Sequence, residues 1–391
     1  MARTHSARQA DPRRPGRHRP YSVERDGRDW HDWHDWHDWH DGGTGMADAP
    51  LRVGIIGLGR SGWNIHADAI ADHEGFEVAA VADPVPERRR EAEERFGCAA
   101  HTEPEGVIGT EGLDIVVVAT PSHTHVPLTL AALEAGSHVV VEKPMAASVA
   151  EMDELIAAAD RADRVLTCYL PRRLDVDFDF VRQVLASGLL GKPILLRRTV
   201  HRFQRRADWQ TLRKYGGGEL SNTTPHVLDQ VLLLLDEEPA EVFADLRHTV
   251  GRGDAEDHVK LTLRGPNLPL AEVESSMCMA IPQPDWQITG TTGALVGDGQ
   301  TFTTRWFDEA AANAPHLDEG PAAGRRYGSG EAIDWQEEVR TLGRGTRSAA
   351  LRYYDRLEAT LRAGADLFVT PESVRRQVRI IEEARRQTGY A

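Results

Sequence analysis

The stretch "LRVGIIGLGRSG", residues 51–62, decides how the first part of the chain is expected to fold. Its opening run, "LRVGII", is typical of a buried strand, and the glycine-rich turn leads into "WNIHADAIADHEG", a helix-like segment closed by Gly75. The next strand candidate, "FEVAAVA", ends at Asp83. Strand, Gly-x-Gly-x-x-Gly turn, helix, strand and acidic residue, in this order, predict a dinucleotide-binding fold.

Each glycine of the turn has a separate task in such a site. Gly57 permits the tight turn, Gly59 lets the backbone approach a pyrophosphate, and Gly62 allows the helix to pack closely on the strand. Arg60 and Ser61 lie in the same turn, where backbone N–H groups and the helix dipole would face the phosphates. The alternative, a glycine turn without a ligand, is disfavoured by the complete strand and helix context.

Asp83 is the residue that bears on the choice of cofactor. Its carboxylate is expected to accept hydrogen bonds from the adenosine ribose, and its charge would repel a 2′-phosphate. NAD is therefore favoured, while NADP stays possible because Arg88, Arg89 and Arg90 lie nearby. We interpret these three arginines as a solvated helix face.

Two further strand candidates end in polar residues at one expected edge of the sheet. "LDIVVVAT" ends at Thr120 before Pro121, and "SHVVVEK" ends at Glu142 and Lys143. Alternating strands and helices, with "RVLTCY" as a later strand, indicate a parallel sheet whose carboxyl ends share one edge. Doubly wound sheets bind ligands at that edge.

Lys143 is one of four lysines in the chain, and this geometry delivers it to the cofactor. An ammonium beside a positively charged nicotinamide should have a depressed pKa and could act as a general base. The alternative is a lysine that ends the strand and pairs with Glu142.

Composition excludes several classes of partner. The formal net charge of -15 argues against nucleic acids and acidic membranes. Cys98, Cys168 and Cys278 lie far apart without metal-ligand spacing, so we expect a cytoplasmic protein with neither disulfides nor a metal. No apolar run approaches the roughly 18 residues that cross a bilayer, and the N-terminus lacks the apolar core of a signal peptide.

Residues 1–48 differ from the rest of the chain. They contain almost no aliphatic residues and include the repeat "DWHDWHDWHDWHD", so we expect a disordered low-complexity tail. Metal capture by the repeated His residues is the alternative. Met46 directly precedes the start of the expected fold.

The second half of the chain predicts a sheet with one covered face. Two amphipathic helices, "SAALRYYDRLEATLRAG" and "PESVRRQVRIIEEARRQ", follow a predicted loop at residues 313–332, and Thr370 is expected to cap the second helix. "GTTG" predicts a hairpin turn. The strand candidates are "PILLRRTVHRF", "EVFADLRHTV", "DHVKLTLRG", "LPLAEVESSMCMA", "DWQITGTTGALVGD" and "QTFTTRWFD".

From about Leu51 to Tyr390 the sequence resembles the Gfo/Idh/MocA family, which includes glucose-fructose oxidoreductase and inositol dehydrogenase. The motifs that carry the resemblance are "VGIIGLGRSG", "VVVATPSHTHVPLTLAALEAGSHVVVEKPMA", "YLPRRLDVDFDFVRQVLASGLLGKPILLRR" and "GGGELSNTTPHVLDQVLLLL". The resemblance implies an N-terminal Rossmann domain at residues 49–170. It also implies a C-terminal α+β domain at residues 171–391, with a large open, mainly antiparallel sheet that binds substrate and forms a homodimer or homotetramer.

The resemblance also implies the reaction and its residues. The expected enzyme moves a hydride between NAD(P) and a secondary hydroxyl or ketone of a sugar, cyclitol or related polyol. Lys143, His226 and Asn222 would lie at the catalytic centre, with His226 as the proton shuttle on the substrate hydroxyl. His125 is a further candidate for contact with the cofactor. Further candidates for the substrate wall, including Asp229 from the family pattern, are Arg172, Arg173, His201, Arg202, Trp209, Tyr215 and Asp229.

Asn222 is the serious departure from the family pattern, which has an Asp at this position. An amide can hold a hydroxyl group by hydrogen bonds but cannot take its proton at neutral pH. We expect Pro225 in the first turn of a helix and Asn222 in the preceding loop. Two other functions stay open: an NAD-retaining glycosidase or lyase that uses transient oxidation, and a non-catalytic NAD-binding sensor.

Overall fold

The computed structural model describes residues 49–310, 320, 332–343, 345 and 347–390. The predicted tail and nearly all of the predicted loop at residues 313–332 lie outside these ranges. Among the described helices, none combines the length and the apolar character needed to cross a membrane.

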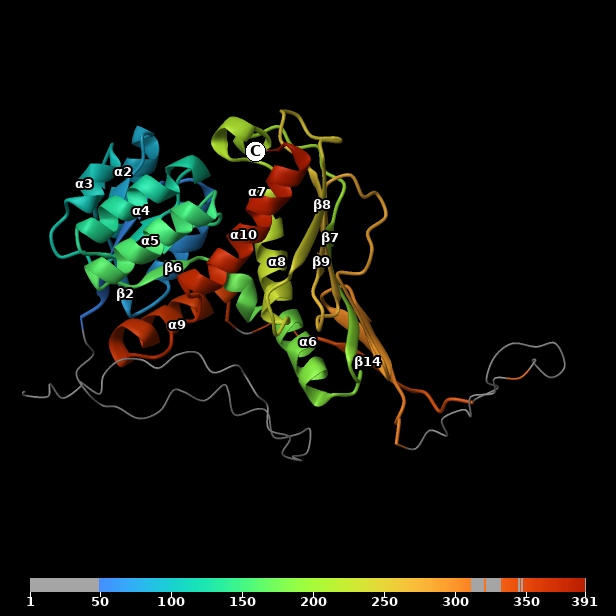
Figure 1. Cartoon of the computed structure of the whole chain (residues 1–391). Helices are drawn as coiled ribbons and strands as arrows, with labels where there is room; N and C mark the ends of the chain where they lie inside the picture. Colours follow the sequence, from blue (N-terminus) through green and yellow to red (C-terminus); the bar gives the residue numbers. More distant parts are fainter. Residues whose placement is uncertain (1–48, 311–319, 321–331, 344, 346, 391) are drawn as a thin grey trace, which may run out of the picture. The chain divides into compact units, whose positions relative to one another are not determined.

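The first sheet is parallel, with strand order β3-β2-β1-β4-β5-β6. Figure 1 labels two of its strands, β2 and β6. The order reverses beside β1, so the carboxyl ends of β1 and β4 flank the switch point where doubly wound sheets bind ligands. The predicted Rossmann sheet is confirmed, and β3 is an added strand that the sequence did not predict. The strands are β1 (Leu51–Ile56), β2 (Phe76–Ala82), β3 (Ala99–His101), β4 (Ile115–Val118), β5 (His138–Val141) and β6 (Leu166–Cys168).

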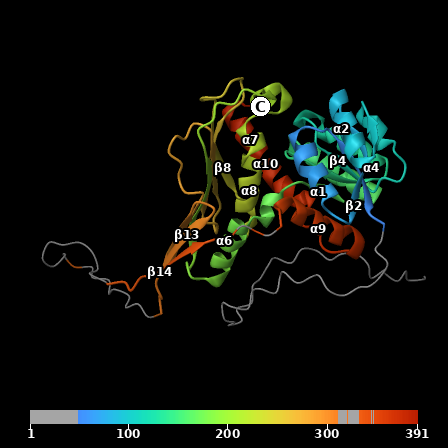
Figure 2. The same cartoon turned by 180° about the vertical axis from the view of Figure 1, so that it is seen from behind.

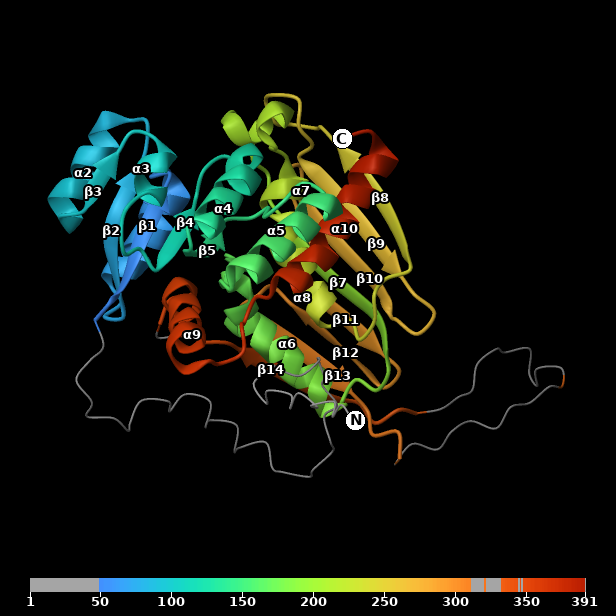
Figure 3. The same ribbon diagram turned by 60° about the vertical axis from the view of Figure 1, so that its left-hand side comes forward.

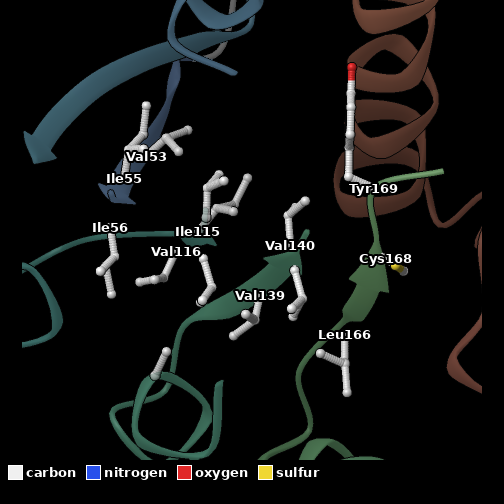
Figure 4. Close-up of a cluster of buried hydrophobic side chains, with 14 of the residues drawn as sticks. Val53, Ile55, Ile56, Ile115, Val116, Val139, Val140, Leu166, Cys168 and Tyr169 are labelled. Carbon is white, nitrogen blue, oxygen red and sulfur yellow. The ribbon is translucent and has the colours of Figure 1, made fainter. Parts of the chain in front are cut away.

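The helix expected after the glycine turn begins as a wider π-helical turn, η2 (Gly62–Ala67), and continues as α1 (Asp68–Ala71). The wider turn carries the buried side chains of His66 and Ala67. The other helices of this half are α2 (Pro86–Phe96), α3 (Pro104–Ile108), the 3-10 turn η3 (Ser122–Thr124), α4 (His125–Glu134) and α5 (Val149–Ala162). β1, β4, β5 and β6 supply the aliphatic core between these helices (Figure 4).

The second sheet has strand order β14-β13-β12-β11-β7-β10-β9-β8. Its strands pair antiparallel except β7 and β10, which are parallel. The predicted mainly antiparallel sheet and the hairpin between β11 and β12 are confirmed, whereas β14 was not predicted. The strands are β7 (Pro193–His201), β8 (Glu241–Arg247), β9 (His258–Arg264), β10 (Leu270–Ser276), β11 (Trp286–Gly290), β12 (Gly293–Gly297), β13 (Thr301–Trp306) and β14 (Gln336–Thr341).

Helices cover one face of this second sheet, as Figure 3 shows for α6, α8 and α10. Their apolar residues meet the inward side chains of alternate strand positions, such as Trp286 and Phe302. The elements are η4 (Pro171–Leu174), α6 (Val176–Ser187), η5 (Trp209–Thr211), η6 (Arg213–Tyr215), α7 (Glu219–Asn222), α8 (Thr224–Leu233), α9 (Ala349–Ala363) and α10 (Pro371–Thr388).

The two C-terminal helices do not belong to one core. Tyr353, Tyr354 and Leu357 of α9 pack into the core of the parallel sheet, and Figure 2 shows α9 beside α1. α10, capped by Thr370 as predicted, contributes Val378 to that core and further residues, including Ile381, to the core of the second sheet. Residues distant in sequence thus complete the nucleotide-binding half, and the boundary at residue 170 stays a prediction.

Truncating a buried residue of α9 tests this arrangement. Leu357 is 4% exposed, so Leu357→Ala should lower the free energy of unfolding by about 2–5 kcal/mol, measured by urea denaturation. Arg356→Ala, at the exposed neighbouring position, is the control and should change the unfolding free energy by less than about 0.5 kcal/mol. Equal, small effects of both variants would show that α9 is not part of the core.

Candidate active site

The glycine turn after β1 has the shape that a dinucleotide requires. Gly57 has a φ of +93°, and a Cβ there would lie 2.6 Å from the carbonyl oxygen of Ala119. A Cβ on Gly62 would lie 1.8 Å from the carbonyl oxygen of Gly57, so neither glycine tolerates a side chain. A Cβ on Gly59 would meet no protein atom within 4 Å. The space beside Gly59 is therefore open to a ligand, as expected for a pyrophosphate-binding turn.

Asp83 follows β2 and faces this turn. Its Oδ2 accepts a hydrogen bond of 2.8 Å from the backbone N–H of Leu58, and its Oδ1 accepts one of 2.9 Å from Val85. The carboxylate is 3% exposed. It is therefore fixed against the glycine turn, and its contact with a ribose stays a prediction.

The three arginines near Asp83 have different surroundings. Arg88 Nη1 lies 3.2 Å from Asp83 Oδ2, and Arg89 Nη1 donates a 2.6 Å hydrogen bond to the Asp83 carbonyl. Arg90 is exposed and approaches Glu94 at 3.9 Å. Arg88 and Arg90 are exposed, as expected for a solvated helix face, whereas Arg89 is partly buried.

His125 joins the two loops that follow β4 and β5. Its Nδ1 lies 2.7 Å from the carbonyl oxygen of Pro144, and its Nε2 lies 2.9 Å from that of Thr120. Burial lowers the pKa of this imidazole, although the two carbonyls oppose the shift. A neutral ring carries one N–H and donates to one carbonyl at a time. His125 therefore sets the separation of the Thr120–Pro121 and Lys143–Pro144 loops, and its contact with cofactor stays a prediction.

Lys143 lies just after β5 and reaches the second half of the protein. Its Nζ donates to the backbone oxygen of Asn222 at 2.9 Å and to the Asn222 Oδ1 at 3.2 Å. Burial lowers the pKa of the amine, while the carboxylates of Glu142 and Glu219 oppose the shift. The structure thus brings Lys143 and Asn222 into direct contact at the expected edge.

His226 lies on α8 in the same cluster. Burial lowers its pKa well below the ordinary value, and the charges of Lys143 and Arg172 act in the same direction. Its Nδ1 is buried and has no hydrogen-bond partner among the described residues. The lowered pKa favours a neutral imidazole, and Nδ1 is left without a hydrogen-bond partner near the charge of Lys143.

Asn222 is the last residue of α7, so its predicted place in a loop is wrong. Gly218, with a φ of +108°, starts this short helix, and the N–H of Asn222 donates to its carbonyl at 3.0 Å. Pro225 does lie in the first turn of α8, as predicted, because a first-turn proline interrupts no helical hydrogen bond. The proline begins a second helix directly after the first.

Asp229 is held by Arg173 in a buried ion pair. Arg173 Nε donates to Asp229 Oδ2 at 2.8 Å, and Nη2 donates to Oδ1 at 2.6 Å. The neighbouring Arg172 acts on Lys143 and His226 through its charge. Asp229 and Arg173 therefore tie η4 to α8, while their substrate contacts, and that of Arg172, stay predictions.

The remaining candidates for the substrate wall differ in how close they lie to the cofactor edge of the parallel sheet. The ring of Tyr215 lies 5.8 Å from that of His123, which follows Pro121 at the cofactor edge. His201 pairs with a carboxylate of the second sheet, and Arg202 donates to Glu219 at 2.8 Å. Trp209 is 42% exposed. Of this group, Tyr215 has the position next to a cofactor loop that a substrate contact needs.

Sequence reasoning did not single out Glu219 and His66. Glu219 is 1% exposed, and its Oε1 accepts hydrogen bonds from Ser275 at 2.6 Å and from Arg202. Its position three residues before Asn222, on one side of a helix, is the signal that could have identified it. His66 contacts the carboxylate of Glu142, a side chain that points into the protein. The signal that could have identified His66 is its helical spacing after Gly62.

A small cavity borders Glu219 and Asn222. Its volume of about 10 Å³ has room for one water molecule and not for a sugar. In the part of the chain that the structure describes, no group of three or more His, Cys, Asp or Glu residues is arranged to hold a metal ion.

Comparisons with known proteins agree with this geometry. The family model described as "Oxidoreductase family, NAD-binding Rossmann fold" matches residues 51–170, and the GFO/IDH/MocA C-terminal domain matches residues 178–296. An uncharacterized oxidoreductase of Escherichia coli is 31% identical over 64% of this chain and 71% of its own length. Myo-inositol 2-dehydrogenase of Thermotoga maritima is 30% identical over 65% of this chain and 77% of its own length.

Solved structures show the same fold. An NAD-binding protein from Listeria innocua aligns with a TM-score of 0.74 and 24% identity over 87% of this chain and 97% of that protein. Biliverdin reductase from Synechocystis, in complex with biliverdin and NADP+, aligns with a TM-score of 0.71 and 19% identity over 87% of this chain and 99% of that protein.

The fold and the matched family models define an NAD(P)-dependent oxidoreductase that acts on CH–OH groups. The chain belongs to the GFO/IDH/MocA oxidoreductase family.

The ion pair at Asp83 predicts how cofactor preference responds to mutation. Asp83→Ser removes the repulsion of a 2′-phosphate and frees Arg88 to bind it, so kcat/KM for NADP relative to NAD should rise by about tenfold or more. The gain should disappear in Asp83→Ser combined with Arg88→Ala. A wild-type enzyme that already prefers NADP would contradict the assigned role of Asp83.

Proposed function

We propose that the protein is an NAD-dependent dehydrogenase that moves a hydride between nicotinamide and a secondary hydroxyl or ketone of a cyclitol, sugar or related polyol. The observation that carries this proposal is the contact of the Lys143 amine with Asn222, beside the neutral His226. Among the relatives are proteins named myo-inositol 2-dehydrogenase, scyllo-inositol 2-dehydrogenase (NADP(+)) and D-glucoside 3-dehydrogenase, which supports the substrate class.

The hydrogen bonds of Lys143 suit a general base. A neutral amine has two N–H bonds and one lone pair, and the two oxygens of Asn222 accept both N–H bonds. The lone pair is then free to accept the proton of a substrate hydroxyl. The lowered pKa favours this neutral form, since a buried ammonium loses its hydration.

His226 would share the substrate oxygen. Its unpartnered Nδ1 can accept a hydrogen bond if the proton is on Nε2, or donate one in the other tautomer. An imidazole can therefore orient the hydroxyl during oxidation and hydrogen-bond the carbonyl oxygen that results. Lys143 and His226 would together give the oxygen of the reacting C–O group two hydrogen-bond contacts to nitrogen.

Residues of the parallel sheet would hold the cofactor next to this pair. The backbone around Gly57, Gly59 and Gly62 would face the pyrophosphate, and Asp83 would bind the ribose. Bound NAD supplies the hydride acceptor. Thr120 and Pro121 lie on the loop after β4, and His125 sets the distance from that loop to Lys143.

We propose that the protein forms a homodimer or homotetramer through the exposed face of the second sheet. The helices α6, α8 and α10 cover one face, while Phe243 and Val339 lie on the opposite face with exposures of 62% and 63%. Apolar groups on a broad open sheet are typical of a surface that packs against another subunit. We place the protein in the cytoplasm, where its three free cysteines would stay reduced.

Replacing Lys143 tests the proposed reaction. Lys143→Met should retain NAD binding but lower turnover of an active polyol by about a hundredfold or more, measured as NADH formation with a panel of cyclitols and sugars. Lys143→Arg should not restore turnover, because a guanidinium stays protonated. Lys192→Met is the exposed control and should be fully active. Full activity of Lys143→Met would contradict the proposal, as would product release without net NADH, which indicates a glycosidase or lyase.

Restoring the family's acidic residue should shift the pH profile. In Asn222→Asp the new carboxylate lies beside the amine, so the pKa of Lys143 should rise by about 1–3 units. A general base works above its pKa, and the acid limb of kcat/KM should therefore move to higher pH, with less activity at neutral pH. An unchanged acid limb would show that Lys143 is not the titrating base.

A further inference from the structure

A chain of three buried polar side chains ends at the residue before Lys143. The Tyr354 hydroxyl lies 2.7 Å from His66 Nδ1, and His66 Nε2 lies 3.3 Å from Glu142 Oε1. Glu142 Oε2 accepts a hydrogen bond of 3.2 Å from the backbone N–H of Lys143. Tyr354 and His66 are 0% exposed, and Glu142 is 6% exposed. The chain thus connects α9, the turn after the glycines and the end of β5.

The two contacts of the His66 ring are satisfied when Nε2 carries a proton. If one ring nitrogen of His66 carries the proton, the Tyr354 hydroxyl donates to Nδ1 and the N–H of Nε2 donates to the Glu142 carboxylate; if both nitrogens carry protons, Nδ1 donates to the hydroxyl oxygen and Nε2 still donates to Glu142. Burial raises the pKa of Tyr354 well above its ordinary value, so the phenol stays a donor. In either protonation form, the contact with Tyr354 is compatible with an N–H of His66 on Glu142.

The contacts of Glu142 keep its carboxylate ionised, whereas burial alone would favour the protonated acid. Burial raises the pKa of the Glu142 carboxyl, but the hydrogen bond and charge of His66, followed by the charge of Lys143, lower it overall to about 2. Glu142 is in turn the largest influence that opposes the lowered pKa of Lys143. The other groups that act on or feel the charge of Lys143 are Glu219 on α7, Cys168 on β6, Arg172 on η4, His226 on α8 and His125 on α4.

We propose that His66 is a positioning residue that holds an ionised Glu142 against Lys143 and thereby sets the proton affinity of that lysine, with Tyr354 holding the His66 ring in place. This inference rests on the proposed role of Lys143 as the base. The neutral residue at position 222 leaves Glu142 and Glu219 as the carboxylates that oppose the effect of burial on Lys143. His66 controls the first of them without touching substrate.

The pKa of Lys143 can be measured without turnover, because the chain has four lysines. The probe is the full-length protein with ¹³C-labelled lysine, titrated by NMR in the presence of NAD, with Lys143→Arg used to assign the resonance. Glu142→Gln removes the charge and should lower the pKa of Lys143 by about one unit or more. His66→Leu should shift the pKa in the same direction, since an unpartnered buried carboxylate is driven toward protonation.

Two further variants separate positioning from general stability. His66→Gln keeps an N–H donor for Glu142 and should return the pKa of Lys143 toward the wild-type value. His73 Nε2 lies 3.0 Å from Oδ1 of Asp355, which lies on helix α9 as Tyr354 does. His73→Leu therefore removes a hydrogen bond to α9 that does not involve Glu142. Both Leu variants should lower thermal stability, but only His66→Leu should move the titration of Lys143 and the acid limb of kcat/KM, both to lower pH.

The outcomes distinguish this inference from the proposed function. A Lys143→Met variant with full turnover overturns the proposed function. If Lys143→Met is inactive while His66→Leu and Glu142→Gln leave the pKa of Lys143 unchanged, the base assignment stands and the role of His66 is wrong. Equal shifts in His66→Leu and His73→Leu would also overturn it, because they would reflect a general loosening of α9.

Discussion

The hydrogen bonds between the Lys143 amine and Asn222 join two structures that the chain builds separately. Lys143 comes from the end of β5 in the parallel sheet, and Asn222 comes from α7 in the half that contains the open sheet. The amine needs these acceptors because burial removes its water. The proposed chemistry therefore requires that the two hydrophobic cores keep Lys143 and Asn222 in contact. Helix α10 contributes apolar residues to both cores.

Burial and the negative charges around the contact of Lys143 with Asn222 change the pKa of the amine in opposite directions. Burial favours a neutral amine at position 143, and the neutral amide at position 222 leaves that preference in place. Glu142 and Glu219 oppose burial without accepting a hydrogen bond from the amine itself. In the proposed mechanism, buried carboxylates near the site would therefore raise the pKa of Lys143 although position 222 carries no charge.

Local sequence patterns predicted much of the fold. The glycine turn, the apolar runs of β1, β4 and β5, and the two C-terminal amphipathic helices each have a short-range signal, and parallel topology then brings Lys143 to the cofactor edge. Tertiary contacts decided the remaining features. The contact between Tyr354 and His66, for example, joins residues 288 positions apart. Asn222 was misplaced because a four-residue helix has too few residues for a periodic signal.

The titration of Lys143 in the wild-type protein with bound NAD tests the central claim most directly. Its resonance can be followed among four lysines without any knowledge of the substrate. A buried amine held by an amide beside a neutral imidazole should lose its proton below the ordinary lysine pKa of about 10.4. A pKa at or above that ordinary value would show a permanent ammonium at the site and would contradict Lys143 as the base.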